Sequence, residues 1–247
     1  MVPDKHYMDR QAELQWSMRF TLLEWIVQVH EKLSLVPETL FLCVNYIDRF
    51  LSCKITSVGK LQLVGATAIF IAAKYEERSP PSVGDIVHMV DYGYTVDEIL
   101  KAERFMLSML QFELGWPGPM SFLRRTSKAD NYDLKTRTLA KYFLEVTIMD
   151  ERFIGTKPSI IVAAAYFLAN VMVKNSGWVG VLLRSSHRRP ADRLTDSCPC
   201  VLLRLYPVSA RTTSCYDYWM LREFQETSPC RFSEIRRLQI PTCVKLR

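Results

Sequence analysis

The sequence predicts an all-α protein, on three observations. Only 9 of its 247 residues are glycine. No stretch alternates β-branched and polar residues as a half-buried strand does. The two longest apolar runs, Leu61–Ala73 and Ile160–Val173, are rich in alanine and have the length of helices. Both are shorter than the ~18 residues that a membrane span requires, so we expect buried helices and no transmembrane segment.

Residues 60–77, KLQLVGATAIFIAAKYEE, predict the central helix of the fold. Apart from three positions the run from Leu61 to Ala73 is apolar on every side, and a helix without a polar face is a buried helix. Charged residues gather at its carboxyl end, and Pro80 and Pro81 predict that it stops near Arg78. We therefore expect a rod surrounded by other helices, with a charged end at the surface.

The residues before this rod predict two more helices. Residues 7–16 are polar and aromatic and favour a short docking helix, after which Ser17 is a candidate N-cap for MRFTLLEWIVQVHEKL. Its apolar residues form two stripes, and either both face the core or one is a docking surface. Pro37 then opens the helix that contains Asp48 and Arg49. These two charges lie among apolar neighbours, so we expect both to have partners.

The chain after the rod predicts two further helices and then a break. Val83–Val90 favours a short helix, and Thr95 with Glu98 predicts a capping box that starts a helix ending near Gln111. The proline- and glycine-rich segment Leu114–Pro119 predicts a linker. Beyond it, Met120–Arg125 and Asp133–Asp150 favour helices that precede the second apolar run. The same order of elements occurs twice, which indicates two copies of one helical fold in tandem.

The composition changes near Trp178. Residues 1–179 carry 20 basic and 20 acidic side chains, whereas residues 180–247 carry 12 and 6 and so hold the entire net charge of +6. This tail also holds five of the seven cysteines, but no C-x-x-C pair, so we expect no metal site there. A shifted reading frame or a translated intron is one hypothesis for the change.

The chain resembles a mitotic, B-type cyclin of the fungal kind. The segments that carry the resemblance are MRFTLLEWIVQVH, ETLFLCVNYIDRFLS, GKLQLVGATAIFIAAKYEERSPP and ILKAERFMLSMLQFELGWPGPMSFLRR for the first cyclin box, and AKYFLEVTIMDERFIGTKPSIIVAAAYFLA for the start of the second. The resemblance implies a cyclin fold with one complete five-helix box and an incomplete second box. It implies an N-terminal docking segment at residues 1–17, a first box at 18–116, a partial second box at 117–178 and a divergent, poorly ordered tail at 179–247.

The resemblance also implies roles for individual residues. Residues that match the kinase-binding surface of the family are Lys74, Glu103, Phe112, Leu63 and Glu77. Residues that match the groove for Arg-x-Leu docking peptides are Met18, Leu22, Trp25 and Gln62. Thr21 departs from the usual aliphatic residue in that groove, which implies weaker peptide binding. Arg19 and Asp48 match a structural ion pair between the first two helices.

The function that the resemblance implies is regulatory. We expect a subunit that binds and activates a cyclin-dependent protein kinase at the G2/M transition, recruits Arg-x-Leu substrates and inhibitors, and acts in nucleus and cytoplasm. We expect no catalytic site, cofactor, metal, nucleic acid or membrane contact. An alternative is a cyclin-fold adaptor in transcription that binds general factors or DNA, although the neutral charge of residues 1–179 disfavours it. An enzyme built on Glu76 and Glu77 is disfavoured, because adjacent helical side chains point about 100° apart.

Overall fold

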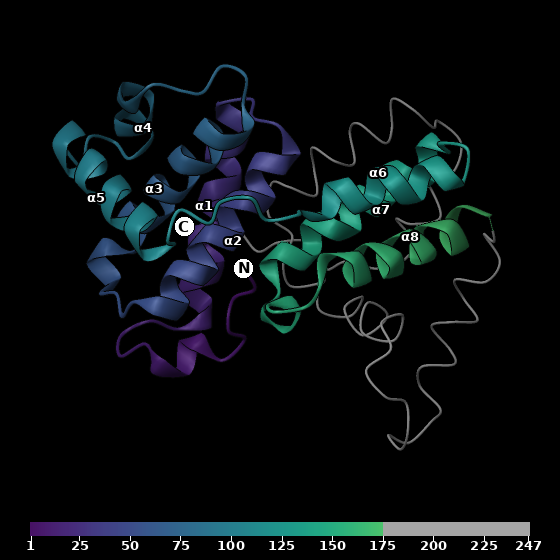
Figure 1. The fold of residues 1–247 in the computed structure, drawn as a ribbon, viewed down its shortest axis with the longest axis horizontal. Coiled ribbons are helices and arrows are strands. Elements are labelled where there is room, and N and C mark those ends of the chain that lie inside the picture. Colours follow the sequence, from purple (N-terminus) through teal and green to yellow (C-terminus); the bar gives the residue numbers. More distant parts are fainter. Residues whose placement is uncertain (175–247) are drawn as a thin grey trace, which may run out of the picture. The chain divides into compact units, whose positions relative to one another are not determined.

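The computed structural model describes residues 1–174, and in this part of the chain every regular element is a helix (Figure 1). The α helices are α1 (Trp16–Lys32), α2 (Pro37–Cys53), α3 (Val58–Glu76), α4 (Val83–Met89), α5 (Val96–Met109), α6 (Pro119–Ala129), α7 (Leu134–Met149) and α8 (Pro158–Lys174). Two short 3-10 helices, η1 (Tyr7–Arg10) and η2 (Glu151–Phe153), complete the set. The predicted all-α class is confirmed.

Helix α3 is the centre of the first group of helices, as its apolar sequence predicted. It packs against α1, α2, α4 and α5. From Val64 to Ala73 every residue of the helix is buried. The closest approach is at Gly65, where an added Cβ would lie 2.8 Å from the Cδ1 atom of Leu22 in α1. The missing side chain therefore allows α1 and α3 to come together at this point.

The second group consists of α6, α7 and α8, which pack against one another. The residues between Met109 and Pro119 form no helix, so the predicted linker is present. Helix α8 buries Val162, Ala165 and Ala169. Within residues 1–174 the chain thus forms five helices, a linker and three helices, in the order that the sequence predicted.

Two predictions at the amino end of the fold need correction. Ser17 does not cap α1, because the helix begins at Trp16 and its N-cap is Gln15, which makes no side-chain cap hydrogen bond. The backbone oxygen of Gln15 accepts from the amides of Met18 and Arg19 at 3.0 and 3.2 Å, so the helix begins two residues earlier than predicted. Residues 7–16 form a single turn of 3-10 helix at Tyr7–Arg10 and not a longer helix.

Capping residues were easier to predict. The capping box of α5 is present: the Thr95 hydroxyl accepts from the Glu98 amide, and the Glu98 carboxylate accepts from the Thr95 amide at 2.9 Å. A second capping box, which the sequence analysis did not identify, joins Ser82 and Asp85 at the start of α4. The predictions for the tail at 179–247 lie outside the described residues.

Candidate functional site

The carboxyl end of α3 meets α5 at an ion pair. The Lys74 ammonium group contacts the Glu103 carboxylate, and Lys74 Nζ also lies 4.2 Å from the ring centroid of Phe70. The lysine side chain remains 41% exposed, whereas the glutamate side chain is only 11% exposed. The fold therefore holds one accessible cation over a buried carboxylate and an aromatic ring, which fixes the direction in which the cation points.

Phe112 lies just beyond the end of α5, and 70% of its surface is exposed. Its φ of +56° is a left-handed conformation that an aromatic residue seldom adopts. The turn is held from both sides, because the Phe112 amide donates to the oxygen of Leu107 at 3.0 Å, and Arg49 of α2 donates to the oxygen of Glu113 at 2.7 Å. The same pair of positive φ angles follows α4 at Asp91–Tyr92 and α6 at Asn131–Tyr132, so this backbone conformation is a recurring turn after a helix.

Leu63 and Glu77, which also match the kinase-binding surface of the family, take no part in the ion pair of Lys74 and Glu103. Leu63 is half-buried and precedes Lys74 by 11 residues, so it lies on nearly the same side of α3 but about 16 Å along the axis. Glu77 has a structural role that was not predicted from the sequence. Its Oε1 atom accepts from the Val36 amide at 2.8 Å and from the Thr39 hydroxyl at 2.6 Å. Glu77 thus fixes the start of α2 against the end of α3.

The groove residues lie on α1 and at the other end of α3. Leu22 is buried, Met18 and Trp25 are half-buried, and Gln62 is exposed. An added Cβ at Gly65 would lie 3.3 Å from the Trp25 ring, so this ring rests against α3. The sequence left open whether the stripe of Met18, Leu22, Trp25 and Val29 on α1 faces the core or forms a docking surface. In the structure Leu22 and Val29 lie in the core, whereas Met18 and Trp25 are partly exposed.

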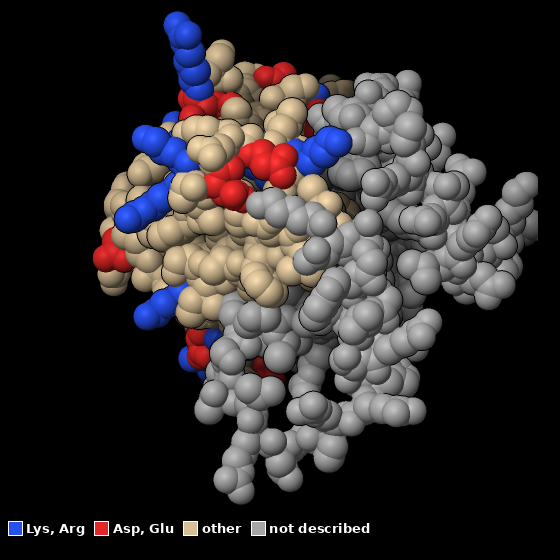
Figure 2. All heavy atoms as spheres, turned by 90° about the vertical axis from the view of Figure 1, so that its right-hand side faces the viewer, with Lys and Arg blue, Asp and Glu red and all other residues tan. Residues whose placement is uncertain are grey.

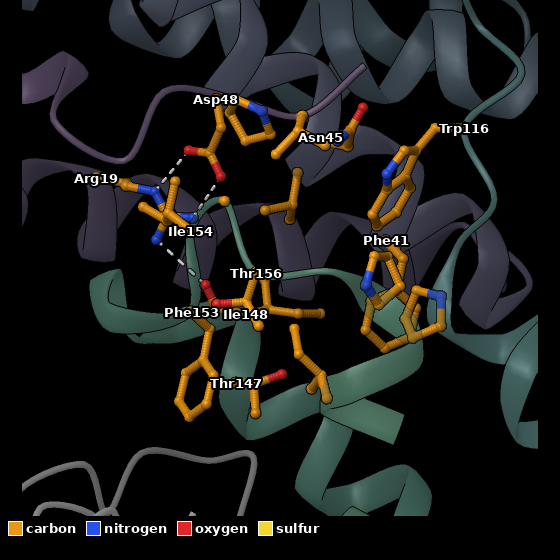
Figure 3. Close-up of a pocket in the computed structure, with 17 residues that line it drawn as sticks. Arg19, Phe41, Asn45, Asp48, Trp116, Thr147, Ile148, Phe153, Ile154 and Thr156 are labelled. Carbon is orange, nitrogen blue, oxygen red and sulfur yellow. Dashed lines mark hydrogen bonds and ion pairs between the residues drawn. The ribbon is translucent and has the colours of Figure 1, made fainter. Parts of the chain in front are cut away.

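Arg19 and Asp48 form a buried ion pair with two parallel hydrogen bonds of 2.8 Å each. Two further groups complete the network. The Tyr7 hydroxyl donates to Asp48 at 2.8 Å, and Arg19 Nη1 donates to the backbone oxygen of Ile148 at 3.2 Å (Figure 3). Burial alone would lower the pKa of Arg19, but the carboxylate of Asp48 outweighs it and raises that pKa. Burial, and then Asp48, raise the pKa of Tyr7. The network joins η1, α1, α2 and α7.

A cavity of about 90 Å³ lies beside this network. Arg19 and Asp48 line one side, and the rings of Phe41 and Trp116 lie on the other side of the close-up (Figure 3). It is lined by none of the residues that match the kinase-binding surface or the peptide groove. The cavity therefore belongs to the junction between the first five helices and the last three.

Some contacts could not be predicted from the sequence, because their residues lie in segments without helical periodicity. Gln11 is buried and donates to the backbone oxygens of Leu51 and Lys54 at 2.7 and 2.8 Å, while its own Oε1 accepts from the Thr56 amide at 2.9 Å. It fixes the loop that leads into α3. A single glutamine in a polar segment carries no signal in the sequence that predicts such a role.

Helix α8 exposes part of its apolar side. Ile160 is 41% exposed and Phe167 is 56% exposed, and they are two turns apart on one side of the helix. Figure 2 faces the side of the molecule on which α6, α7 and α8 lie in Figure 1, and it shows a broad uncharged area bordered by charged side chains. Among residues 1–174 no helix is long and apolar enough to span a membrane, and no cluster of three side chains is suited to a metal ion.

The chain is similar in sequence to known proteins. The sequence models of the cyclin N-terminal and C-terminal domains match residues 1–115 and 117–214. G2/mitotic-specific cyclin-4 of Candida albicans is 57% identical over 177 residues, which are 72% of this chain and 36% of that protein. G2/mitotic-specific cyclin-3 of Saccharomyces cerevisiae is 56% identical over 176 residues, or 71% of this chain and 41% of that protein.

A solved structure, the viral cyclin from herpesvirus saimiri, has a similar fold. Its TM-score is 0.64 at 21% identity, with 79% of this chain and 85% of that chain covered. The chain spans only about two fifths of the length of the fungal relatives. Two domain models in the order found here, and fungal mitotic relatives above half identity, lead to one conclusion: the chain belongs to the cyclin family.

Proposed function

We propose that this chain is the regulatory subunit of a cyclin-dependent protein kinase and that it binds and activates that kinase at the G2/M transition. The observation that carries the proposal is the ion pair of Lys74 and Glu103, which places an accessible cation at the end of the buried helix α3. Phe112 adds an exposed aromatic ring at the end of the neighbouring helix α5. The fungal relatives are G2/mitotic-specific cyclins, which supports the assignment to this cell-cycle stage.

The chain contributes binding energy and performs no catalysis of its own. In protein kinases a Lys–Glu ion pair and a metal-binding Asp must both be in place, and the position of one regulatory helix controls this. A partner that binds only the active position of that helix shifts the population toward it. The rigid support of Lys74 by Glu103 and Phe70 suits this task, because a preorganised surface loses little entropy on binding.

The second proposed surface recruits substrates and inhibitors that carry Arg-x-Leu motifs. Met18 and Trp25 offer half-buried apolar side chains to the leucine, and Gln62 offers an exposed amide to the peptide backbone. Thr21 is exposed on the same helix, where an aliphatic residue would add apolar contact, so we expect weaker binding than in relatives with that residue. We propose that the complex acts in the nucleus and the cytoplasm.

The test is co-purification with a cyclin-dependent kinase, followed by a histone kinase assay. We expect the intact chain to retain the kinase on an affinity resin and to raise its activity. The double variant Lys74→Ala/Glu103→Gln should lose both effects, with unchanged helical circular dichroism. The matched control is Asp150→Ala/Arg152→Ala, which removes an ion pair of similar exposure, 41% for the arginine and 14% for the aspartate, from the segment between α7 and α8. A folded chain that leaves the kinase unbound and inactive contradicts the proposal.

A further inference from the structure

The segment between α3 and α4 presents a serine that has no role in the proposed function. Ser79 is exposed and is followed by Pro80, which is exposed as well. Among residues 1–174 this is the only serine or threonine followed directly by proline. No hydrogen bond joins the Ser79 hydroxyl to any other residue in the part of the chain that the structure describes.

The segment between α3 and α4 is anchored at both ends. Glu77 has φ −80° and ψ 143°, and Ser82 has φ −74° and ψ 162°, which are values of extended backbone. Glu77 is tied to the start of α2 through its carboxylate, and Ser82 is tied to Asp85 through the capping box. Between these anchors Pro80 and Pro81 fix their own φ angles near −65°. The chain bends at Arg78 and Ser79, so the structure displays Ser79 on a short exposed segment that is held at both ends.

We propose that Ser79 is a phosphate acceptor for proline-directed serine/threonine protein kinases. Such enzymes require an acceptor hydroxyl that is followed directly by proline. Ser79 meets both requirements, because its side chain is exposed and Pro80 is the next residue.

The reaction is an ordinary phosphoryl transfer from ATP. The Ser79 Oγ atom attacks the γ-phosphorus, and the bond from that phosphorus to the oxygen that bridges to the β-phosphate breaks. The hydroxyl proton passes to the catalytic aspartate of the modifying kinase. The products are phosphoserine 79 and ADP, and no oxidation or reduction takes place. The phosphate adds a charge of about −1.5 to −2 at neutral pH.

This charge would enter a surface that already holds several carboxylates. Glu38, Glu76 and Glu77 lie close enough to interact, since burial first and then Glu38 and Glu77 raise the pKa of Glu76. Ser79 follows the end of α3 by three residues, so it lies within about 11 Å of that end. A phosphate there competes with Glu103 for the ammonium group of Lys74. The consequence, weaker capture of the kinase partner, rests on the proposed function.

The first experiment uses the full chain without a partner. It is incubated with Mg-ATP and an active proline-directed kinase that does not require this chain, and the phosphate is located by mass spectrometry. We expect phosphate on Ser79, none at that position in Ser79→Ala, and at least a tenfold loss in Pro80→Ala. The matched control Ser108→Ala changes an exposed helical serine without a following proline and should leave phosphorylation of Ser79 unchanged.

Two outcomes overturn the assignment. One is an unmodified Ser79 in a folded chain, and the other is equal modification of Ser79 in the wild type and in Pro80→Ala. The sequence also holds Ser228–Pro229 outside the described residues, which is why the position of the phosphate must be mapped. Circular dichroism of each variant shows that it has folded.

The second experiment compares capture of a cyclin-dependent kinase by the phosphorylated and the unmodified chain. We expect several-fold weaker capture by the phosphorylated chain at low salt and a smaller difference at high salt, because salt screens the added charge. Equal capture at low salt overturns the consequence for binding. If neither form captures the kinase, the proposed function fails, whereas the mass-spectrometric result for Ser79 stands independently.

Discussion

Arg19 and Asp48 show how one buried pair can be held by several elements at once. Asp48 accepts three short hydrogen bonds, two from Arg19 and one from Tyr7, and Arg19 donates a further one to Ile148. Transfer of two charges from water to the interior is costly, and the cost is offset only when the geometry is good and the remaining polar atoms have partners. Here the geometry meets that condition, so the loss of either partner should be severe.

The first prediction concerns this pair. Arg19→Met should lower the free energy of unfolding by about 3–5 kcal/mol, because it leaves the Asp48 carboxylate buried without its cation. The control Arg10→Ala removes an exposed ion pair with Asp4, which is worth about 1 kcal/mol or less. Urea denaturation of the wild type and both variants measures the difference. Equal losses in the two variants would contradict a structural role for the buried network.

The second prediction concerns the close approach of α1 and α3. Gly65→Ala should destabilise the fold by about 1–3 kcal/mol, because the added methyl group meets Leu22 Cδ1 at 2.8 Å and Ile26 Cδ1 at 3.2 Å. The control is Gly59→Ala in the first turn of the same helix, where an added Cβ meets no atom within 4 Å. That variant should stabilise the fold by about 0.5–1 kcal/mol through its higher helix propensity. Thermal denaturation should show a lower melting temperature for Gly65→Ala and a higher one for Gly59→Ala. A stabilised Gly65→Ala variant would contradict the close packing of α1 against α3.

At the scale of the element, the two capping boxes set where α4 and α5 begin. The hydrogen bonds from the backbone amide and hydroxyl of Thr95 hold the pKa of Glu98 below its ordinary value of 4.5. Those from Ser82 do the same for Asp85, whose ordinary value is 3.8. A carboxylate with a depressed pKa in the folded state stabilises that state fully above the ordinary pKa, and this contribution is lost as the pH falls through the depressed value.

The third prediction follows from this sign. Glu98→Gln keeps a side chain that can complete the capping box but cannot titrate. The wild type should therefore be more stable than the variant at pH 7, and the difference should shrink below pH 4.5. Chemical denaturation at several pH values from 3 to 7 measures it. Arg104→Gln on the exposed side of the same helix is the control and should show no such convergence, because Arg104 is not among the charges that lower the pKa of Glu98. A constant difference across the range would show that the Glu98 carboxylate plays no part.

The elements that the sequence predicted well are those with a local signal. Thr95 and Glu98 carry the spacing of a capping box, and the apolar run of α3 has no polar face, so both predictions are confirmed. The start of α1 was misplaced because Ser17 has the chemistry of an N-cap, whereas backbone bonds to Gln15 decide where the helix opens. Contacts such as those of Glu77 with Val36 and Thr39 join residues about 40 positions apart. No local pattern can indicate them.

The candidate site, too, was predicted only in part. The resemblance to the family selected Lys74, Glu103 and Phe112 as members of one surface, and the structure pairs the first two. The supports of Phe112 were not predicted. Arg49 donates to the oxygen of Glu113, and the Tyr46 hydroxyl donates to the oxygen of Leu114 at 2.9 Å. Both belong to α2, so the exposed ring depends on a helix that lies far from it in sequence.

At the scale of the whole molecule, α3 connects the two proposed surfaces. Gln62 and Lys74 are 12 residues apart, which corresponds to about 18 Å along the helix axis. The Debye length in physiological salt is about 8 Å, so charges at one end are screened from the other. Sites separated by more than about 10 Å without shared partners usually respond to substitution independently. The rod should therefore hold kinase binding and peptide docking at separate places.

The fourth prediction tests this separation. Trp25→Ala removes the half-buried ring that rests against Gly65, so it should reduce the affinity for an Arg-x-Leu peptide at least tenfold while it leaves kinase capture within twofold of the wild type. Lys74→Ala/Glu103→Gln should give the reverse pattern. Fluorescence anisotropy with a labelled peptide and co-precipitation with the kinase measure the two effects, and thermal denaturation shows that each variant is folded. If both variants lost both activities while folded, α3 would couple kinase binding to peptide docking, and the predicted independence of the two surfaces would be wrong. The supports seen at the two ends, Gly65 under Trp25 and Phe70 under Lys74, share no side chain, and for that reason we expect independence.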